Sequence, residues 1–191
     1  MKKGDIKTIE LINGWGESYK VQARFLGAGA FAKAYEYENS VYAIVNHGQK
    51  HSDYSKEAVA NFASGLNVPE IEVLGHTDSA IIYKMPLYQP LTVKNWKAWD
   101  NFKMLLKCWN QTSNNFRSGL DFNYAFLAKV QESALSDEIK ESVESIISAG
   151  SNYGDNYRIE ICKRNLAVDD KGNLILLDIL FNADALKKNQ K

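Results

Sequence analysis

The chain has 191 residues, 45% of them hydrophobic, which suffices for the core of one compact domain, with room for two lobes around one cleft. Lys and Arg total 23, as do Asp and Glu, so the formal charge is zero, which argues against a protein that coats nucleic acid or another polyanion. Residues 1–16 lack the apolar core of a signal peptide, and no run of about 18 apolar residues follows. We therefore expect a cytoplasmic protein without a membrane span.

Alternation of apolar and polar residues predicts an antiparallel meander of five strands in the first half of the chain. A helix over about residues 52–65 interrupts these strands. Ser52 or Asp53 is expected to cap its first turn, because a side-chain oxygen there accepts free backbone N–H groups, and Gly65 to end it. The predicted strands cover residues 21–26, 34–38, 41–45, 71–74 and 80–85.

The apolar period becomes helical from residue 92, after a connector that Pro86 and Pro90 bracket. A first helix runs to Gln111, others follow around residues 122–130 and 136–150, and residues 166–177 form a β-hairpin. One face of the first helix is predicted to carry Trp96, Trp99, Phe102, Leu106 and Trp109.

This order of elements is α+β in class. It predicts a single domain with an antiparallel five-stranded small lobe (about residues 1–86), a hinge (87–91) and an abbreviated helical lobe with a terminal hairpin (92–191).

Residues 26–35, Leu-Gly-Ala-Gly-Ala-Phe-Ala-Lys-Ala-Tyr, resemble the glycine-rich loop of protein kinases. A loop that covers phosphates needs residues without bulky side chains, so that backbone N–H groups can approach the oxygens. Gly27 and Gly29 meet that need, and Phe31 is placed to cap the phosphates from the loop tip. Ala32 replaces the third glycine of the kinase pattern. The alternative is an ordinary hairpin turn.

A second kinase-like pattern begins at Glu160, which is followed after four residues by Asn165, and the hairpin then leads to Asp178. In kinases an Asp at the first position orients the attacking hydroxyl, while the Asn and the second Asp hold Mg²⁺ on the phosphates. Asn165 and Asp178 are oxygen ligands suited to Mg²⁺. Lys163 takes the place of a residue that serves the γ-phosphate in many kinases. The alternative is a hairpin with polar ends.

Part of the kinase pattern is altered. In the strand of residues 42–45, Val45 stands where kinases have the lysine that contacts the α- and β-phosphates. Lys33, Lys50 and Lys56 are candidate replacements, and no spacing rule selects one of them.

Two other positions, Glu57 and Met85, follow the kinase pattern more closely, whereas Glu160 departs from it. Glu57 lies about where the glutamate that steadies that lysine is expected; its alternative role is a solvated helix residue. Met85 belongs to the segment that would face the adenine. Glu160 is one methylene longer than aspartate, which displaces its carboxylate by about 1 Å, and such a misplacement can cost about 10²-fold in rate.

Three stretches carry a resemblance to a family: FLGAGAFAKAY (25–35), IIYKMPLY (81–88) and NYGDNYRIEICKRNLAVDDKGNLILLDILF (152–181). Together they resemble phage-encoded protein-kinase-like proteins, which include the early Ser/Thr protein kinase of short-tailed coliphages. The resemblance implies a two-lobed kinase-like fold, ATP and Mg²⁺ as cofactors, and a host protein as partner in host takeover. It implies ATP-binding residues Gly27, Gly29, Phe31, Glu57 and Met85, catalytic residues Glu160 and Lys163, and metal ligands Asn165 and Asp178.

The sequence leaves several functions open. The leading one is a degenerate kinase, or pseudokinase, that acts by binding and modulating a host protein, because Val45 and Glu160 depart from the kinase pattern. The second is an active ATP- and Mg²⁺-dependent Ser/Thr kinase that phosphorylates itself or host proteins. The third is an interaction module without kinase chemistry, which would use the tryptophan-rich face of residues 96–109, although core packing is the expected role of that face. No nucleic acid is expected as a partner in any of them.

Overall fold

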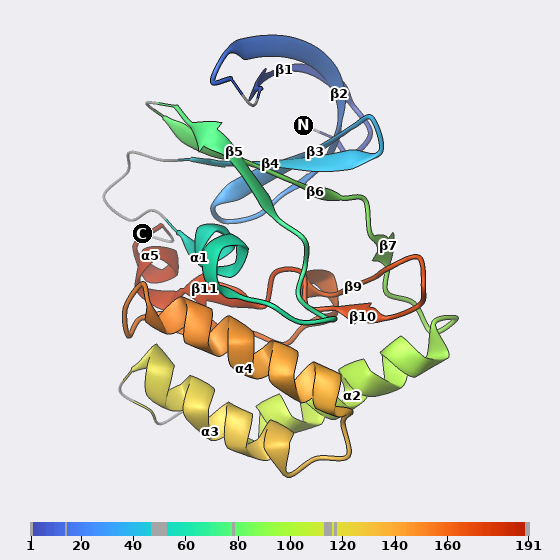
Figure 1. Ribbon diagram of the computed structural model, residues 1–191, viewed down its shortest axis with the longest axis vertical. Coiled ribbons are helices and arrows are strands. Elements are labelled where there is room, and N and C mark those ends of the chain that lie inside the picture. Colours follow the sequence, from blue (N-terminus) through green and yellow to red (C-terminus); the bar gives the residue numbers. More distant parts are fainter. Residues whose placement is uncertain are drawn as a thin grey trace. The chain divides into compact units, whose positions relative to one another are not determined.

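The computed structural model describes residues 2–13, 15–46, 53–77, 79–112, 116 and 118–189 (Figure 1). The protein is α+β, as predicted, and divides into two compact units. The first unit comprises Met1–Asp53, Glu70–Leu87 and Ala185–Lys191, and the second comprises Tyr54–Pro69 and Tyr88–Asp184. Within the described ranges, none of the helices combines the length and the apolar composition needed to cross a membrane.

An antiparallel six-stranded sheet forms the first unit, with its strands in the order β1-β2-β3-β4-β6-β5. The five predicted strands are all present, but the expected total of five is wrong because β1 adds a sixth. The apolar residues of β1 lie at positions 6, 9, 11 and 12, so its sequence does not follow a strict period of two. The strands are β1 (Ile6–Ile12), β2 (Ser18–Ala28), β3 (Ala32–Tyr37), β4 (Ser40–Asn46), β5 (Glu72–His76) and β6 (Ala80–Pro86).

The sheet curls so that its first strands enclose an apolar core (Figure 1). Phe25 and Tyr35, on neighbouring strands, pack with their ring centroids 5.5 Å apart. This cross-strand pair and the β-branched residues around it stabilise the sheet through buried area and aromatic contact. The cluster comprises Ile9, Leu11, Ile12, Val21, Ala23, Phe25, Tyr35, Tyr42 and Ile82.

The second unit contains the helices α1 (Ser55–Phe62), α2 (Trp96–Gln111), α3 (Gly119–Gln131) and α4 (Asp137–Ser151). In Figure 1, α4 lies beside α3, and α1 packs against α4 as well. A buried apolar stripe begins just before α4 and continues along it: Leu135, Ile139, Val143, Ile146 and Ile147. This stripe makes α4 the central helix of the unit.

The prediction for the start of α1 was wrong. Tyr54 precedes the first turn of α1 and makes no side-chain capping bond, Asp53 is buried, and Ser52 lies outside the described residues. The predicted face of α2 lies only partly in the core, because Phe102 is buried and Trp99, Leu106 and Trp109 are half-buried, whereas Trp96 is 72% exposed. The buried residues of α2 are Ala98, Phe102, Leu105 and Cys108.

Short strands complete the second unit. The predicted hairpin is present as β9 (Ala167–Val168) and β10 (Leu174–Ile175), and β7 (Gln89–Pro90) pairs with β9. The strands β8 (Tyr157–Ile159) and β11 (Leu180–Asn182) pair antiparallel and were not predicted, since three residues are too few for a period to show. A turn of 3-10 helix spans Lys163–Asn165, and α5 spans Ala183–Asn189.

The segment after α1 is held tightly against α4. The N–H of Ser64 donates to Ser145 Oγ at 2.8 Å, and that of Asn67 donates to Ser142 Oγ at 3.2 Å. Gly65, between them, has φ +137°, and a Cβ atom there would lie 2.5 Å from Ser142 Oγ. Only glycine fits this position, because it combines a positive φ with close approach of another helix.

Candidate functional site

In the first unit, the glycine-rich segment forms the turn between β2 and β3. Gly29 N–H donates to the carbonyl of Ala32 at 2.8 Å, and the register of the two strands shifts between Phe25 and Gly27. Gly27 and Gly29 both have negative or extended φ, and a Cβ atom on either would meet nothing within 4 Å. Neither backbone conformation nor packing therefore requires glycine here. Glycine also allows a ligand to approach the backbone closely, because it has no side chain.

Among the other predicted residues of the first unit, Lys33, Val45 and Met85 occupy ordinary sheet positions, and Phe31 lies in the turn before β3. Val45 is 3% exposed in β4, where it pairs with Ile81, and Met85 is 6% exposed in β6. Phe31 is half-buried and Lys33 is exposed, while Lys50 lies outside the described residues. Val45 is thus a core residue of the sheet, and its side chain contributes no charge.

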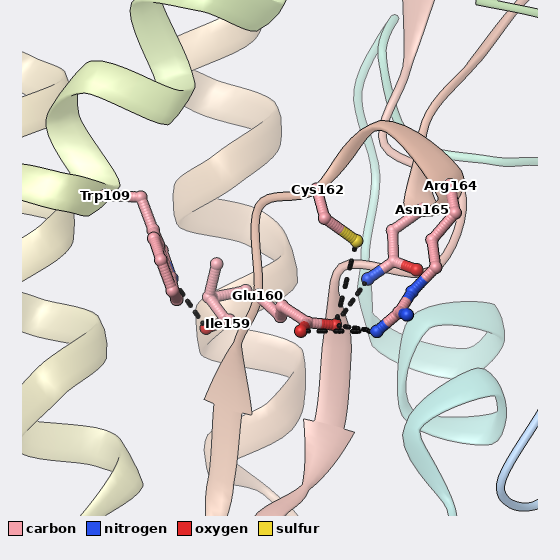
Figure 2. Close-up of polar contacts among 6 residues, drawn as sticks. All are labelled: Trp109, Ile159, Glu160, Cys162, Arg164 and Asn165. Carbon is pink, nitrogen blue, oxygen red and sulfur yellow. Dashed lines mark hydrogen bonds and ion pairs between the residues drawn. The ribbon is translucent and has the colours of Figure 1, made fainter.

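In the second unit, the 160–165 segment forms a compact polar cluster (Figure 2). Asn165 Nδ2 donates to Glu160 Oε2 at 3.0 Å, and Arg164 donates to both oxygens of the same carboxylate at 3.4 and 3.3 Å. Figure 2 shows Cys162 on the same side, with its Sγ atom 3.8 Å from Glu160 Oε2. Of the three predicted site residues in this segment, Glu160 and Asn165 are in direct contact, and the third is Lys163.

Strand pairing sets the position of this cluster. Glu160 follows β8 directly, and its N–H donates to the carbonyl of Ile179 at 2.7 Å, next to β11. Asp178 N–H donates to the carbonyl of Asn165 at 3.0 Å. On the far side of β8, Trp109 Nε1 donates to the carbonyl of Ile159 at 3.2 Å (Figure 2). The backbone bond between them brings Asn165 and Asp178 together although they are thirteen positions apart in the sequence.

The side chains of Asn165 and Asp178 fit a hard divalent cation. Because its Nδ2 atom donates to Glu160, the Asn165 amide leaves Oδ1 as its ligand atom, and Asp178 adds carboxylate oxygens on a side chain that is 50% exposed. Mg²⁺ is usually bound through one or two protein oxygens, with waters and phosphate oxygens completing the octahedron. The described residues hold no group of three or more His, Cys, Asp or Glu side chains placed to bind a metal. A metal ion held by Asn165 and Asp178 would need further ligands, such as waters or phosphate oxygens.

Two contacts of α1 were not predicted. Lys56 Nζ lies 2.6 Å from Asp178 Oδ1, although the two residues are 122 positions apart in the sequence. The neighbouring Glu57 is half-buried and accepts a hydrogen bond from the Tyr153 hydroxyl at 3.3 Å, so it is not a solvated helix residue. Burial raises the pKa of Tyr153 most, a hydrogen bond with Asn61 opposes the shift, and the charge of Glu57 raises the pKa further. No spacing rule in the sequence indicates either contact.

Lys163 and the tryptophans have different surroundings from those expected. Lys163 is exposed, and its Nζ atom lies 5.5 Å from the centroid of the Trp99 ring, within cation–π range. Trp99 also packs edge-on against Phe102, with centroids 5.4 Å apart. With Trp109 bonded to Ile159, Trp96 alone of the α2 tryptophans is largely exposed. Most of the tryptophan-rich face thus serves packing within the second unit.

Cys162 is a half-buried thiol at the centre of the cluster. Burial raises its pKa most, the negative charge of Glu160 raises it further, and Arg164 opposes the shift. A thiol with a raised pKa is protonated at neutral pH and is a weak nucleophile. The raised pKa lowers the fraction of thiolate at neutral pH, and with it the reactivity of the Cys162 sulfur.

No protein-family model matches the sequence, and no curated protein matches it.

Proposed function

We propose that this protein is a degenerate kinase-like protein that binds a nucleoside triphosphate with Mg²⁺ and acts by binding another protein, without transferring phosphate. The observation that carries the proposal is the set of hydrogen bonds and the ion pair made by the Glu160 carboxylate. Its carboxylate accepts hydrogen bonds from Asn165 and Arg164, and Arg164 pairs with its charge at 3.3 Å. A general base must be able to accept the proton of the attacking hydroxyl, and a carboxylate committed to an arginine is poorly suited to that role.

Binding of the nucleotide rests on Asn165 and Asp178. These residues would hold Mg²⁺, which when bound neutralises the phosphate charge. Asn165 is oriented by its bond to Glu160, and Asp178 by its backbone bond to Asn165.

The partner is proposed from resemblance. Kinase-like proteins of phages act on host proteins in the host cytoplasm, so we propose a host protein as the ligand and host takeover as the role. The exposed Trp96 and Val93, 72% and 67% exposed, are apolar residues near the start of α2. Once a partner protein has been identified, these two residues are the first to substitute in a binding assay.

The test is a thermal-shift titration with ATP, with and without Mg²⁺, on the wild type and Asp178→Asn. The expected result is an Mg²⁺-dependent rise in Tm that the variant loses, because a ligand stabilises the folded state that binds it. A parallel assay with γ-labelled ATP should give no labelled protein. Labelling that Asp178→Asn abolishes would overturn the degenerate assignment, and no shift with millimolar ATP would overturn nucleotide binding.

An active Ser/Thr kinase is the second candidate, and Lys56 favours it. Its ammonium lies beside Asp178 and could supply the charge that Val45 does not. In an active enzyme Glu160 would be the base, so Glu160→Gln should abolish labelling while leaving the ATP-dependent rise in Tm. Unchanged labelling in Glu160→Gln would exclude this assignment of the base.

A further inference from the structure

Lys56 makes a close ion pair at the proposed metal site. Its Nζ atom is 2.6 Å from Asp178 Oδ1, and its side chain is only 13% exposed, whereas that of Asp178 is 50% exposed. The lysine stem is therefore enclosed by the protein, and its ammonium reaches a carboxylate that opens to solvent. An ion pair in which one partner is shielded is screened less by water and salt than an exposed pair.

Hydrogen bonds connect the chain segment that follows Lys56 to the segment that precedes Asp178. On the side of Lys56, the segment after α1 is bound to α4 through Ser64 and Asn67. Asn67 also donates from Nδ2 to the carbonyl of Leu174 at 2.6 Å, and its own carbonyl accepts from the N–H of Leu176 at 2.9 Å. Leu176 is two residues from Asp178. The same residue, Asn67, thus connects the segment after α1 to the strand that leads to Asp178.

The ammonium and a metal ion compete for the same carboxylate. Lys56 occupies Asp178 Oδ1 with one positive charge, and Mg²⁺ binding there would place two more positive charges close to it. Mg²⁺ also gives up its waters reluctantly, so it gains little from a carboxylate that is already paired. Phosphate oxygens would remove this conflict, because they accept the ammonium and ligate the metal at once.

We propose that Lys56 couples metal binding to nucleotide binding at this site: it competes with the divalent cation for Asp178 when nucleotide is absent, and contacts the phosphates when nucleotide is present. This inference rests on the proposed binding of a nucleoside triphosphate. In kinases a strand lysine supplies the positive charge that contacts the phosphates, and here Val45 stands in its place. The proposal assigns that charge to Lys56 instead. By linkage, the nucleotide and the metal then strengthen each other's binding.

The experiment measures Mn²⁺ binding to the full chain by water-proton relaxation, without nucleotide and with saturating ATP. The variants are Lys56→Met, Lys56→Arg and Asp178→Asn. Methionine keeps the length of the stem and a high helix propensity, so α1 should form, and circular dichroism checks this. Arginine keeps the charge and serves as the conservative control.

The expected result is that Lys56→Met binds Mn²⁺ alone about tenfold more tightly than the wild type, while ATP improves Mn²⁺ binding far less in this variant; couplings of this kind are typically about 5–150-fold. Lys56→Arg should behave as the wild type does. Asp178→Asn should lose Mn²⁺ binding, which shows that the signal comes from this carboxylate.

Equal Mn²⁺ affinity in the wild type and Lys56→Met overturns the inference, as does the absence of Mn²⁺ binding from both. Mn²⁺ binding measured without nucleotide tests the role of Lys56 separately from the proposed binding of nucleotide. If the wild type shows no ATP-dependent change in Tm, the proposed function and the coupling fall together. If ATP binds but the two Mn²⁺ affinities are equal, only the role of Lys56 is wrong.

Discussion

The side-chain amide of Asn165 donates a hydrogen bond to the carboxylate of Glu160 at 3.0 Å. This contact decides which atom of the amide can serve as a metal ligand, since it turns Nδ2 toward Glu160. A residue that orients a ligand from behind typically changes metal affinity by about 10–100-fold when it is removed. If Asn165 binds the metal as proposed, Glu160 would influence the metal affinity without accepting a proton.

The first prediction concerns Glu160 and metal affinity. Glu160→Ala should weaken Mn²⁺ binding in the presence of ATP by about tenfold, because Asn165 loses the acceptor that orients it. Glu160→Gln keeps an oxygen for this bond and should retain most of the affinity. The same relaxation titration reports both values. Equal losses in the two variants would show that the charge of Glu160, and not its hydrogen bond, supports the metal.

The second prediction concerns the reactivity of Cys162. Burial, followed by the charge of Glu160, raises the pKa of this thiol, while Arg164 lowers it. Because the thiolate is the reactive form, Glu160→Gln should accelerate alkylation by iodoacetamide near neutral pH, and Arg164→Ala should slow it. Mass spectrometry of the modified peptide over time gives the rates. Cys162→Ser is the control for the buried Cys108. Rates that change in the same direction in both variants would contradict the assignment.

The third prediction concerns the hairpin turn at Asp169 and its dependence on pH. Burial alone would raise the pKa of Asp169, but hydrogen bonds from Asn173 and Lys171 outweigh it and lower the pKa below its ordinary value. The folded state thus favours the charged form. The resulting stability is present above the unfolded-state pKa of about 3.9 and is lost as the pH falls through the lower pKa of the folded state.

Asp169→Asn provides the matched control, because it keeps an acceptor oxygen and removes the titrating group. Urea unfolding from about pH 7 to about pH 2.5 should show the wild type more stable at the upper end, with the difference shrinking below about pH 4. A difference that stays constant over this range would show that the charge of Asp169 is not favoured by folding.

The fourth prediction concerns Asn123, which is 1% exposed in α3. Its Nδ2 atom donates to the carbonyl of Tyr157 at 2.9 Å, and its Oδ1 atom accepts from the N–H of Ile159 at 2.8 Å. Asn123→Ala leaves both β8 groups buried without this partner, which should lower the free energy of unfolding by about 2 kcal/mol or more. Tyr124→Ala, at a position that is 54% exposed, should change it by about 0.5 kcal/mol or less. Chemical denaturation measures both, and similar losses would contradict the assigned role.

Much of the fold could be predicted because its elements are long and regular. The stripe of α4 has an apolar residue at each turn, β2 alternates buried and exposed residues, and β6 is a short apolar run, so these elements follow from the sequence. The short strands β8 and β11 could not be predicted, since they are held by pairing with each other. The predicted face of α2 is only partly buried because tryptophan counts as apolar in a pattern, yet its large ring can lie half-exposed, as that of Trp99 does.

The candidate site also has a part that the sequence predicts and a part that it does not. The spacing from Glu160 to Asn165 and the hairpin that follows are local, so the sequence alone locates these residues and Asp178. The contact between Lys56 and Asp178 depends on the packing of α1 in the second unit, and no pattern links positions 122 apart. The sequence offered three lysines as replacements for the missing charge and could not choose among them. Packing places Lys56 beside Asp178.

The tight contact of Gly65 with Ser142 has a consequence for timing. With the segment after α1 bound to α4, Lys56 needs no helix movement on the μs–ms scale to reach Asp178 or to leave it. Its exchange between partners requires only rotation about side-chain bonds, which is faster by orders of magnitude. The arrival of a ligand, and not a rearrangement of α1, should therefore set the rate at which this ion pair opens.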